Sequence, residues 1–159
     1  MEQNELSSLE DEKLVWRFVE PIIHQTRGKT PSIKSQVYMS LNDGQRALFM
    51  FQVMYGHAGN GISQFFSHIS YLTDRLNLWL ALKSAMKYFN DTDMVGFVEK
   101  MEIAYFDQSS QAKNIPTLDE LDQLYRELIP QTLKRIGTCI RNNPKEFSLS
   151  VSVQPDIQG

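Results

Sequence analysis

Two histidines, His57 and His68, lie on either side of a glycine-rich turn that ends with Gly59-Asn60-Gly61. Such a turn lets the flanking segments fold back on each other, so the two imidazoles can meet and line a small pocket. Imidazole titrates near neutral pH and both donates and accepts hydrogen bonds, which suits a small-molecule site. Three further residues belong to this candidate pocket: Tyr55, Gln64 and Tyr71. The competing interpretation is that these histidines have only a structural role, because proteins commonly contain a few histidines that bind no ligand.

The usual signatures of catalysis and of metal binding are absent from the sequence. The glycine-rich turn lacks the Gly-Lys-Ser/Thr ending of a phosphate loop, and no nucleophile elbow or zinc-type Cys/His spacing occurs. Glu99 and Glu102 share a helix face, but they do not form the Glu-x-x-His pattern of a di-iron site. Cys139 falls on an apolar stripe and is interpreted as a core residue. We therefore assign no catalytic residue, metal ligand or cofactor, and an enzymatic role is not favoured.

A block of acidic residues forms the second candidate site. Residues 91–127 contain nine acidic and three basic side chains, whereas residues 27–90 contain two acidic and seven basic ones. Carboxylates gathered on one face could bind a basic protein partner. Alternatively, several of them stabilise helix N-termini and the others are solvated surface. The candidate partner-binding residues are Asp91, Asp93, Glu99, Glu102, Asp107, Asp119, Glu120, Asp122 and Glu127.

Helices must position both groups of side chains, because apolar residues recur at helical spacing through most of the chain. Capping-box patterns at residues 7–10 and 117–120 predict two helix starts. Pro21 and Pro130 lie inside the helices that follow. We expect a kink or a break at each, because proline removes a backbone donor and crowds the preceding turn.

Other segments predict the remaining helices. Thr30 followed by Pro31 indicates a cap and a first-turn proline, and Asn42 with Gln45 indicates another capped start. Residues 47–55 are apolar on nearly every side, which is typical of a central, buried helix. Residues 62–69, 71–89 and 94–105 also have helical spacing. The predicted fold is all-α: a single compact domain of about five to seven helices.

The end of the chain has a different pattern. Phe147, Leu149, Val151 and Val153 alternate with serines, which is typical of a short strand, but no partner strand is evident. We expect a helical domain over residues 1–142 and an extended or disordered tail over 143–159. The alternative is a strand that pairs across a dimer or with another protein.

The segments Leu41-Asn-Asp-Gly-Gln-Arg-Ala-Leu-Phe-Met-Phe51 and Gly59-Asn-Gly-Ile-Ser-Gln-Phe-Phe66 resemble a bacterial family that includes a DNA-mimic protein. The family hallmark is a buried helix followed by an Asn-Gly-Gly-Phe-x-Gln-Phe-Phe turn. Gly59 and Asn60 stand in swapped order here, and Ile62 replaces the aromatic residue. The resemblance covers roughly residues 41–105. The hallmark positions that match are Gly61, Gln64, Phe65 and Phe66.

The resemblance implies a bacterial all-α protein that dimerises and whose carboxylates imitate DNA phosphates. Such a protein engages a DNA-binding regulator, because Arg and Lys placed for phosphates can also meet Asp and Glu. The turn itself is interpreted as structural: Gln64 would bond the turn's backbone, and Asn60 can adopt a left-handed conformation. The leading hypothesis is therefore a protein-interaction module. The alternative is a small-molecule binder or unrecognised enzyme with a site near residues 56–61.

Composition narrows the class of protein further. The 159 residues are 42% apolar with a formal charge of −3, which disfavours a disordered chain and direct nucleic-acid binding. The longest apolar runs have five residues, so we expect no membrane span. A single cysteine and an acidic, polar start predict a cytoplasmic protein. The nine Phe and seven Met residues are interpreted mainly as core; helical domains with this much apolar surface often pair identical patches, so we expect a homodimer.

Overall fold

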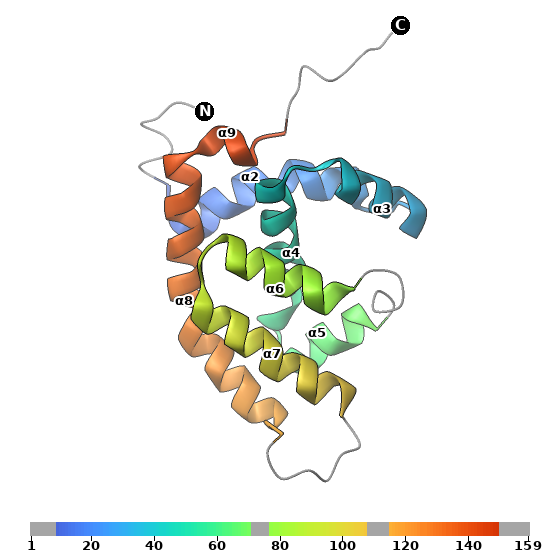
Figure 1. Cartoon of the computed structure of the whole chain (residues 1–159), viewed down its shortest axis with the longest axis vertical. Coiled ribbons are helices and arrows are strands. Elements are labelled where there is room, and N and C mark those ends of the chain that lie inside the picture. Colours follow the sequence, from blue (N-terminus) through green and yellow to red (C-terminus); the bar gives the residue numbers. More distant parts are fainter. Residues whose placement is uncertain (1–8, 71–76, 108–114, 150–159) are drawn as a thin grey trace, which may run out of the picture.

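The computed structural model describes residues 9–70, 77–107 and 115–149. These residues form eight α-helices and no strand, in one compact arrangement, which confirms the all-α prediction (Figure 1). In chain order the helices are α2 (Asp11–Thr26), α3 (Pro31–Ser40), α4 (Asp43–Ala58), α5 (Ile62–Ile69), α6 (Leu78–Tyr88), α7 (Thr92–Phe106), α8 (Leu118–Asn142) and α9 (Pro144–Phe147).

Helix α4 is the centre of the fold, as its apolar sequence predicts. It packs against α2, α5, α6 and α9 (Figure 1). Leu48, Phe51 and Met54 are completely buried along it. A helix that is apolar on most sides has to be covered on most sides, because each exposed large side chain would forfeit about 1.5–3 kcal/mol of burial.

Helices α6, α7 and α8 follow one another as neighbours. Helix α6 packs on α7, and α7 packs on α8, whose other contacts are with α2, α5 and α9 (Figure 1). The connection from α6 to α7 is tight because Asn90 takes a left-handed conformation with φ 57°, which asparagine tolerates better than most residues. Asp91 then caps α7 by accepting a hydrogen bond from the Met94 N–H at 3.1 Å.

Three helix starts are capped as their sequences predict. Thr30 accepts a hydrogen bond from the Ile33 N–H. Asn42 and Gln45 form both bonds of a capping box, at 2.8 and 3.0 Å. Thr117 and Glu120 form the second capping box. The capping box predicted at residues 7–10 is not the start of α2, which begins at Asp11 with Glu10 as N-cap; residues 1–8 lie outside the described part.

The sequence predicted a kink or a break at each of the two prolines, and the structure has no break at either. Helix α2 continues through Pro21, and α8 continues through Pro130 for 25 residues in total. Both prolines are exposed. The carbonyls deprived of their partners belong to Arg17 and Arg126, which also lie on exposed faces. Water can hydrate a carbonyl there, so the lost bond does not terminate the helix.

The helical domain extends past residue 142, contrary to the predicted boundary. Residues 144–147 form the single-turn helix α9, so Phe147 does not belong to a strand. Phe147 is buried and stacks on Phe89, with ring centroids 6.1 Å apart. Gln45 Nε2 donates to the Ser148 carbonyl at 2.7 Å, which ties this end of the chain to α4. The other strand residues expected beyond Leu149 lie outside the described residues.

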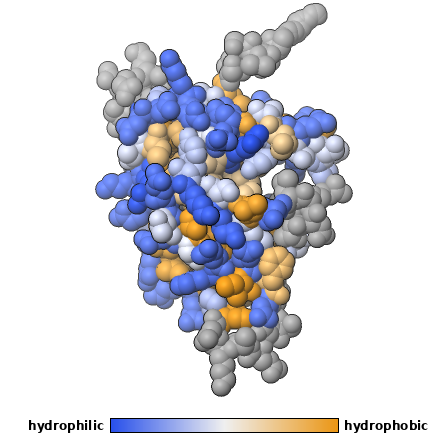
Figure 2. All heavy atoms as spheres, viewed as in Figure 1, coloured by the Kyte–Doolittle hydropathy of each residue, from blue (hydrophilic) through white to orange (hydrophobic). Residues whose placement is uncertain are grey.

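The described surface is mainly polar but not uniformly so. Figure 2 shows a largely hydrophilic face on which hydrophobic side chains emerge over α6 and α7. Leu80 on α6 and Ile103 and Phe106 on α7 are each more than half exposed. A second subunit could cover such side chains, and the expected homodimer stays a prediction. No helix in the described ranges is long and apolar enough to span a bilayer.

Candidate functional site

The imidazoles of His57 and His68 meet, as the position of the turn predicts. Their ring centroids are 3.6 Å apart and the ring planes differ by 21°, so the rings stack. His57 lies in the last turn of α4 and His68 in the last turn of α5. The contact therefore joins two helices on the side of the molecule where α2 and α3 also approach.

A cavity of about 430 Å³ opens beside the histidine pair, and we call it the apolar cavity. Its volume falls in the range of ~300–1,000 Å³ that is usual for small-molecule sites. Five helices contribute to its wall. The lining residues are Trp16, Ile23, Thr26, Arg27, Lys34, Tyr38, Phe49, Met50, Gln52, Val53, Gly56, His57, His68 and Leu78.

The apolar cavity leads from the surface into the core. Met50 and Leu78 in its wall are 1% and 2% exposed, whereas Arg27, Lys34 and His68 are exposed. The buried hydroxyl of Thr26 donates to the Ile23 carbonyl at 3.0 Å and is therefore already satisfied. The floor of the cavity offers apolar contacts, and its polar groups lie at the rim.

The rim of the apolar cavity is electropositive. Burial lowers the pKa of His68 below its ordinary value of 6.5, and the nearby His57 and Lys34 lower it further. His68 is accordingly neutral at pH 7 and can donate or accept a hydrogen bond. Arg27 and Lys34 are the two cationic side chains of the described lining. No Asp or Glu is among the described residues that line the cavity.

The turn between α4 and α5 is built differently from the prediction. Gly61 has φ 115°, a conformation that requires glycine, and Asn60 is not left-handed. Gln64 is exposed and does not line the apolar cavity, so it does not act as the expected buried amide. Instead Asp122 of α8 accepts a hydrogen bond from the Ile62 N–H at 2.7 Å and satisfies the start of α5. This long-range cap gives no signal in the local sequence.

Two other residues of the family-like turn are structural. Phe65 and Phe66 are buried, and both lie edge-on to Trp79 of α6, with ring centroids 6.2 and 6.4 Å apart. Tyr55 points away from the cavity toward α2, because its hydroxyl donates to the Glu12 carboxylate. Tyr71 lies outside the described residues. Of the expected pocket residues, His57 and His68 therefore line the cavity, whereas Tyr55 and Gln64 do not.

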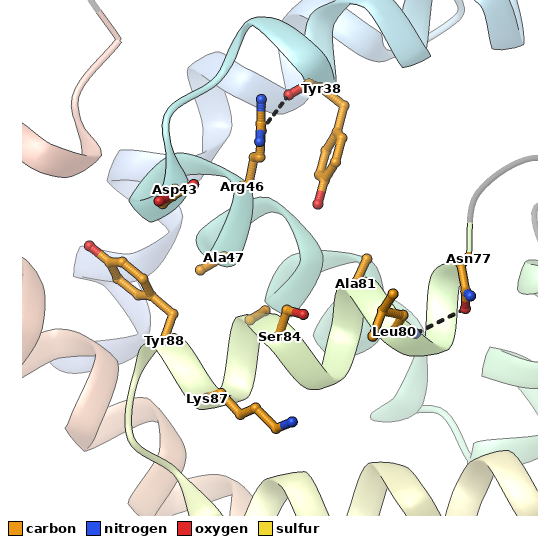
Figure 3. Close-up of a pocket in the computed structure, with 11 residues that line it drawn as sticks. Tyr38, Asp43, Arg46, Ala47, Asn77, Leu80, Ala81, Ser84, Lys87 and Tyr88 are labelled. Atoms are coloured by element: carbon orange, nitrogen blue, oxygen red, sulfur yellow. Dashed lines mark hydrogen bonds between the residues drawn. The ribbon is translucent and has the colours of Figure 1, made fainter.

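A second hollow, the α4–α6 groove, has a volume of about 610 Å³. Figure 3 shows Tyr38 directed from α3 toward α6, while the Lys87 ammonium points away from α4. Arg46 in this groove is committed to its own chain, since it donates to the carbonyls of Tyr38 and Met39 at 3.1 and 2.7 Å. Asp43 adds an opposite charge to the same wall. The groove thus carries charges of both signs, with Lys87 as a second cation, and Tyr38 lines both this groove and the apolar cavity.

Four of the nine acidic candidates cap a helix or pair with a side chain of another helix. Asp91 is buried and accepts a hydrogen bond from the Thr132 hydroxyl at 2.6 Å. Asp122 caps α5, and Glu120 belongs to the capping box of α8, where hydrogen bonds lower the pKa of its carboxyl. Glu102 forms an ion pair with Lys83 of α6 at 2.8 Å. These four carboxylates therefore contribute to folding.

The other five acidic candidates are not gathered by one helix. Glu99 lies one turn before Glu102 on α7, on the side that faces α6. The exposed acidic residues of α8 lie on a different helix, which packs against α7 as α6 does. The five residues are Asp93, Glu99, Asp107, Asp119 and Glu127, of which Asp107 is half-buried and the others are exposed.

Metal binding and thiol chemistry find little support in the described ranges. No group of three or more His, Cys, Asp or Glu residues there could hold a metal ion. Burial raises the pKa of the Cys139 thiol, which reduces the fraction of reactive thiolate at neutral pH. The thiol is half-buried and packs against the core, in keeping with its position on an apolar stripe.

Sequence reasoning missed three residues of the apolar cavity that carry its polar chemistry: Arg27, Lys34 and Tyr38. One signal could have found two of them, because Arg27 and Lys34 fall within the basic segment 27–90 that also contains both cavity histidines. No protein-family model, curated protein or solved structure matches this chain.

Proposed function

We propose that this protein binds a small, largely apolar molecule in the apolar cavity. The observation that carries the proposal is the passage from a rim where His68 is exposed and His57 is half-buried to a floor that is almost completely buried, at Met50 and Leu78. An open cavity of about 430 Å³ with a buried, apolar inner wall provides the enclosed contact area that small-molecule sites usually offer.

The wall of the cavity suits recognition by shape and contact area. Phe49, Val53 and Leu78 offer apolar surface, and Tyr38 and Phe49 lie with ring centroids 6.0 Å apart along one side. Stacking holds the His57 and His68 rings in place at the rim, so the entrance is formed before any ligand arrives. A preformed site loses less conformational entropy on binding than one that has to be assembled.

Gly56 allows the proposal to be tested by filling the cavity. It lies within helix α4, where a larger side chain is compatible with the backbone, and its nearest obstacle is the flexible end of Gln52 at 3.3 Å. Gly56→Phe should place a ring in the cavity, and Gly56→Ala is the matched control that leaves it open. Both variants should keep the helical circular-dichroism spectrum, since both replacement residues have a higher helix propensity than glycine.

The measurement is NMR titration of the three proteins with 1-decanol and, separately, with decanoate. We expect at least one probe to shift the resonances of Phe49, Val53 and Leu78 in the native protein and in Gly56→Ala, but not in Gly56→Phe. If neither probe shifts these resonances, or if Gly56→Phe responds like the native protein, the proposed function is wrong.

The acidic-face hypothesis remains a second proposal with a narrower basis. Exposed carboxylates at Asp93, Asp119 and Glu127 lie on the neighbouring helices α7 and α8, where a basic DNA-binding protein could reach them. Affinity capture from bacterial lysate, with and without excess duplex DNA, tests this. A regulator that DNA displaces, and that a variant with Asn or Gln at these three positions fails to capture, would support DNA mimicry. Equal capture by that variant would contradict it.

A further inference from the structure

The charge at the mouth of the apolar cavity restricts what the cavity can hold. Arg27 follows the last turn of α2, and Lys34 lies in the first turn of α3, so two neighbouring helices each bring one cation to the rim. Neither cation takes part in an ion pair within the described ranges, where the pairs found are Lys83–Glu102, Arg135–Asp91 and Arg141–Asp11. The described lining includes no carboxylate that could neutralise them.

The cavity has an uneven distribution of polar and apolar groups. Its cations are at the rim, whereas the floor at Met50 and Leu78 is apolar and its one buried hydroxyl, on Thr26, is already bonded. A polar group placed at the floor would lose its bonds to water without finding a partner, at a cost of roughly 1–3 kcal/mol. A ligand that fits both ends must therefore be apolar at one end and anionic at the other.

The state of His68 agrees with this polarity. Burial is the main cause of its lowered pKa, and the charge of Lys34 and the neighbouring His57 contribute as well. The same positive potential that disfavours a proton on His68 favours an anion at the rim. A neutral imidazole there can donate one N–H to an anionic oxygen without adding a third charge.

We infer that the natural ligand is an amphipathic anion, whose apolar body fills the cavity and whose single carboxylate is held at the rim by Arg27 and Lys34. This inference rests on the proposed function, because it names the chemical class of the molecule that the cavity binds. Lys34 contributes a flexible ammonium and Arg27 a planar guanidinium that can bind both oxygens of a carboxylate. Their exposure makes each contact modest in energy.

The test compares two probes that share a hydrocarbon chain and differ in the head group: decanoate and 1-decanol, both kept below the concentration at which they aggregate. Affinities are measured by isothermal titration calorimetry at pH 7 on the full chain. The charge-neutralised protein is Arg27→Gln with Lys34→Gln. The control is Lys100→Gln with Lys134→Gln, which removes the same net charge from exposed positions on α7 and α8.

We expect decanoate to bind the native protein more tightly than 1-decanol does. The Arg27→Gln/Lys34→Gln protein should lose roughly tenfold in affinity for decanoate, since two exposed charge contacts together contribute that much. Its affinity for 1-decanol should change less than about twofold, and the Lys100→Gln/Lys134→Gln control should bind both probes like the native protein.

Two results would overturn the inference while leaving the proposed function intact. One is equal binding of decanoate and 1-decanol by the native protein. The other is an equal loss of decanoate affinity in the neutralised protein and in the control, which would show a general effect of net charge. Failure of both probes to bind would instead contradict the proposed function itself.

Discussion

The His57 and His68 rings stack at 3.6 Å across the junction of α4 and α5. Each ring therefore forms part of the other's surroundings, and the nearby His57 helps to lower the pKa of His68. Lys34 on α3 acts on His68 in the same direction. His68 consequently makes the rim of the apolar cavity sensitive to pH.

The lowered pKa of His68 determines how the free energy of unfolding should depend on pH. The pKa of His68 is lower in the folded protein than its ordinary value of 6.5, so the unfolded chain binds more protons on acidification. Stability should therefore fall as the pH drops from about 7 through 6.5 toward the folded pKa, and level off below it. Urea unfolding of the native protein and of His68→Gln at several pH values measures this. The variant should lose part of the pH dependence; an identical dependence in both proteins would show that His68 does not contribute.

Asp91 is predicted to be a folding residue. Its carboxylate caps α7 by accepting a hydrogen bond from the Met94 N–H, and it accepts another from the buried Thr132 hydroxyl. Asp91→Ala removes the cap and leaves the Thr132 hydroxyl with only its longer hydrogen bond, to the Leu128 carbonyl at 3.3 Å. The free energy of unfolding should therefore fall by about 1–3 kcal/mol. The exposed neighbour Asp93→Ala is the control and should cost less than about 1 kcal/mol. Equal losses in chemical denaturation would contradict the structural role of Asp91.

Gly137 marks a close approach between α8 and α2. A methyl group there would overlap with the carboxylate of Asp11, which forms a 2.7 Å ion pair with Arg141. Gly137→Ala should therefore lower the free energy of unfolding by about 1–3 kcal/mol. Gly96→Ala on α7 meets open space and should instead stabilise the protein by up to about 1 kcal/mol. Thermal unfolding of both variants distinguishes them, and stabilisation by Gly137→Ala would show that α2 and α8 can separate freely.

Tyr38 is predicted to limit the length of the ligand, because it lines both the apolar cavity and the α4–α6 groove. Tyr38→Ala should join the two spaces, so that affinity for hexadecanoate rises relative to decanoate. Tyr38→Phe keeps the ring and serves as the control, with the native preference expected. Competition binding of the two carboxylates measures the ratio. An unchanged ratio in Tyr38→Ala would mean that the ring does not separate the two spaces.

The helices were predictable where their signals are local. The Asn42–Gln45 and Thr117–Glu120 capping boxes each act across three residues, so their spacing in the sequence is sufficient to indicate a start. The cap that starts α5 was not predictable, because Asp122 is 60 residues away from Ile62. The break expected at Pro130 failed for a related reason: whether a carbonyl can be hydrated depends on which helix face is exposed.

The candidate site likewise has one part that the sequence predicts and one part that depends on helix packing. That His57 and His68 would meet followed from a short turn, whereas the part played by Arg27 and Lys34 depends on how α2 and α3 pack against α4. The sequence by itself determined an all-α chain, most of its helix starts and its segregated charges, because these depend on hydrophobic spacing and bonds between near neighbours. Only the tertiary structure decided which carboxylates are buried and which cations surround the cavity, because side chains from separate helices converge only once those helices pack.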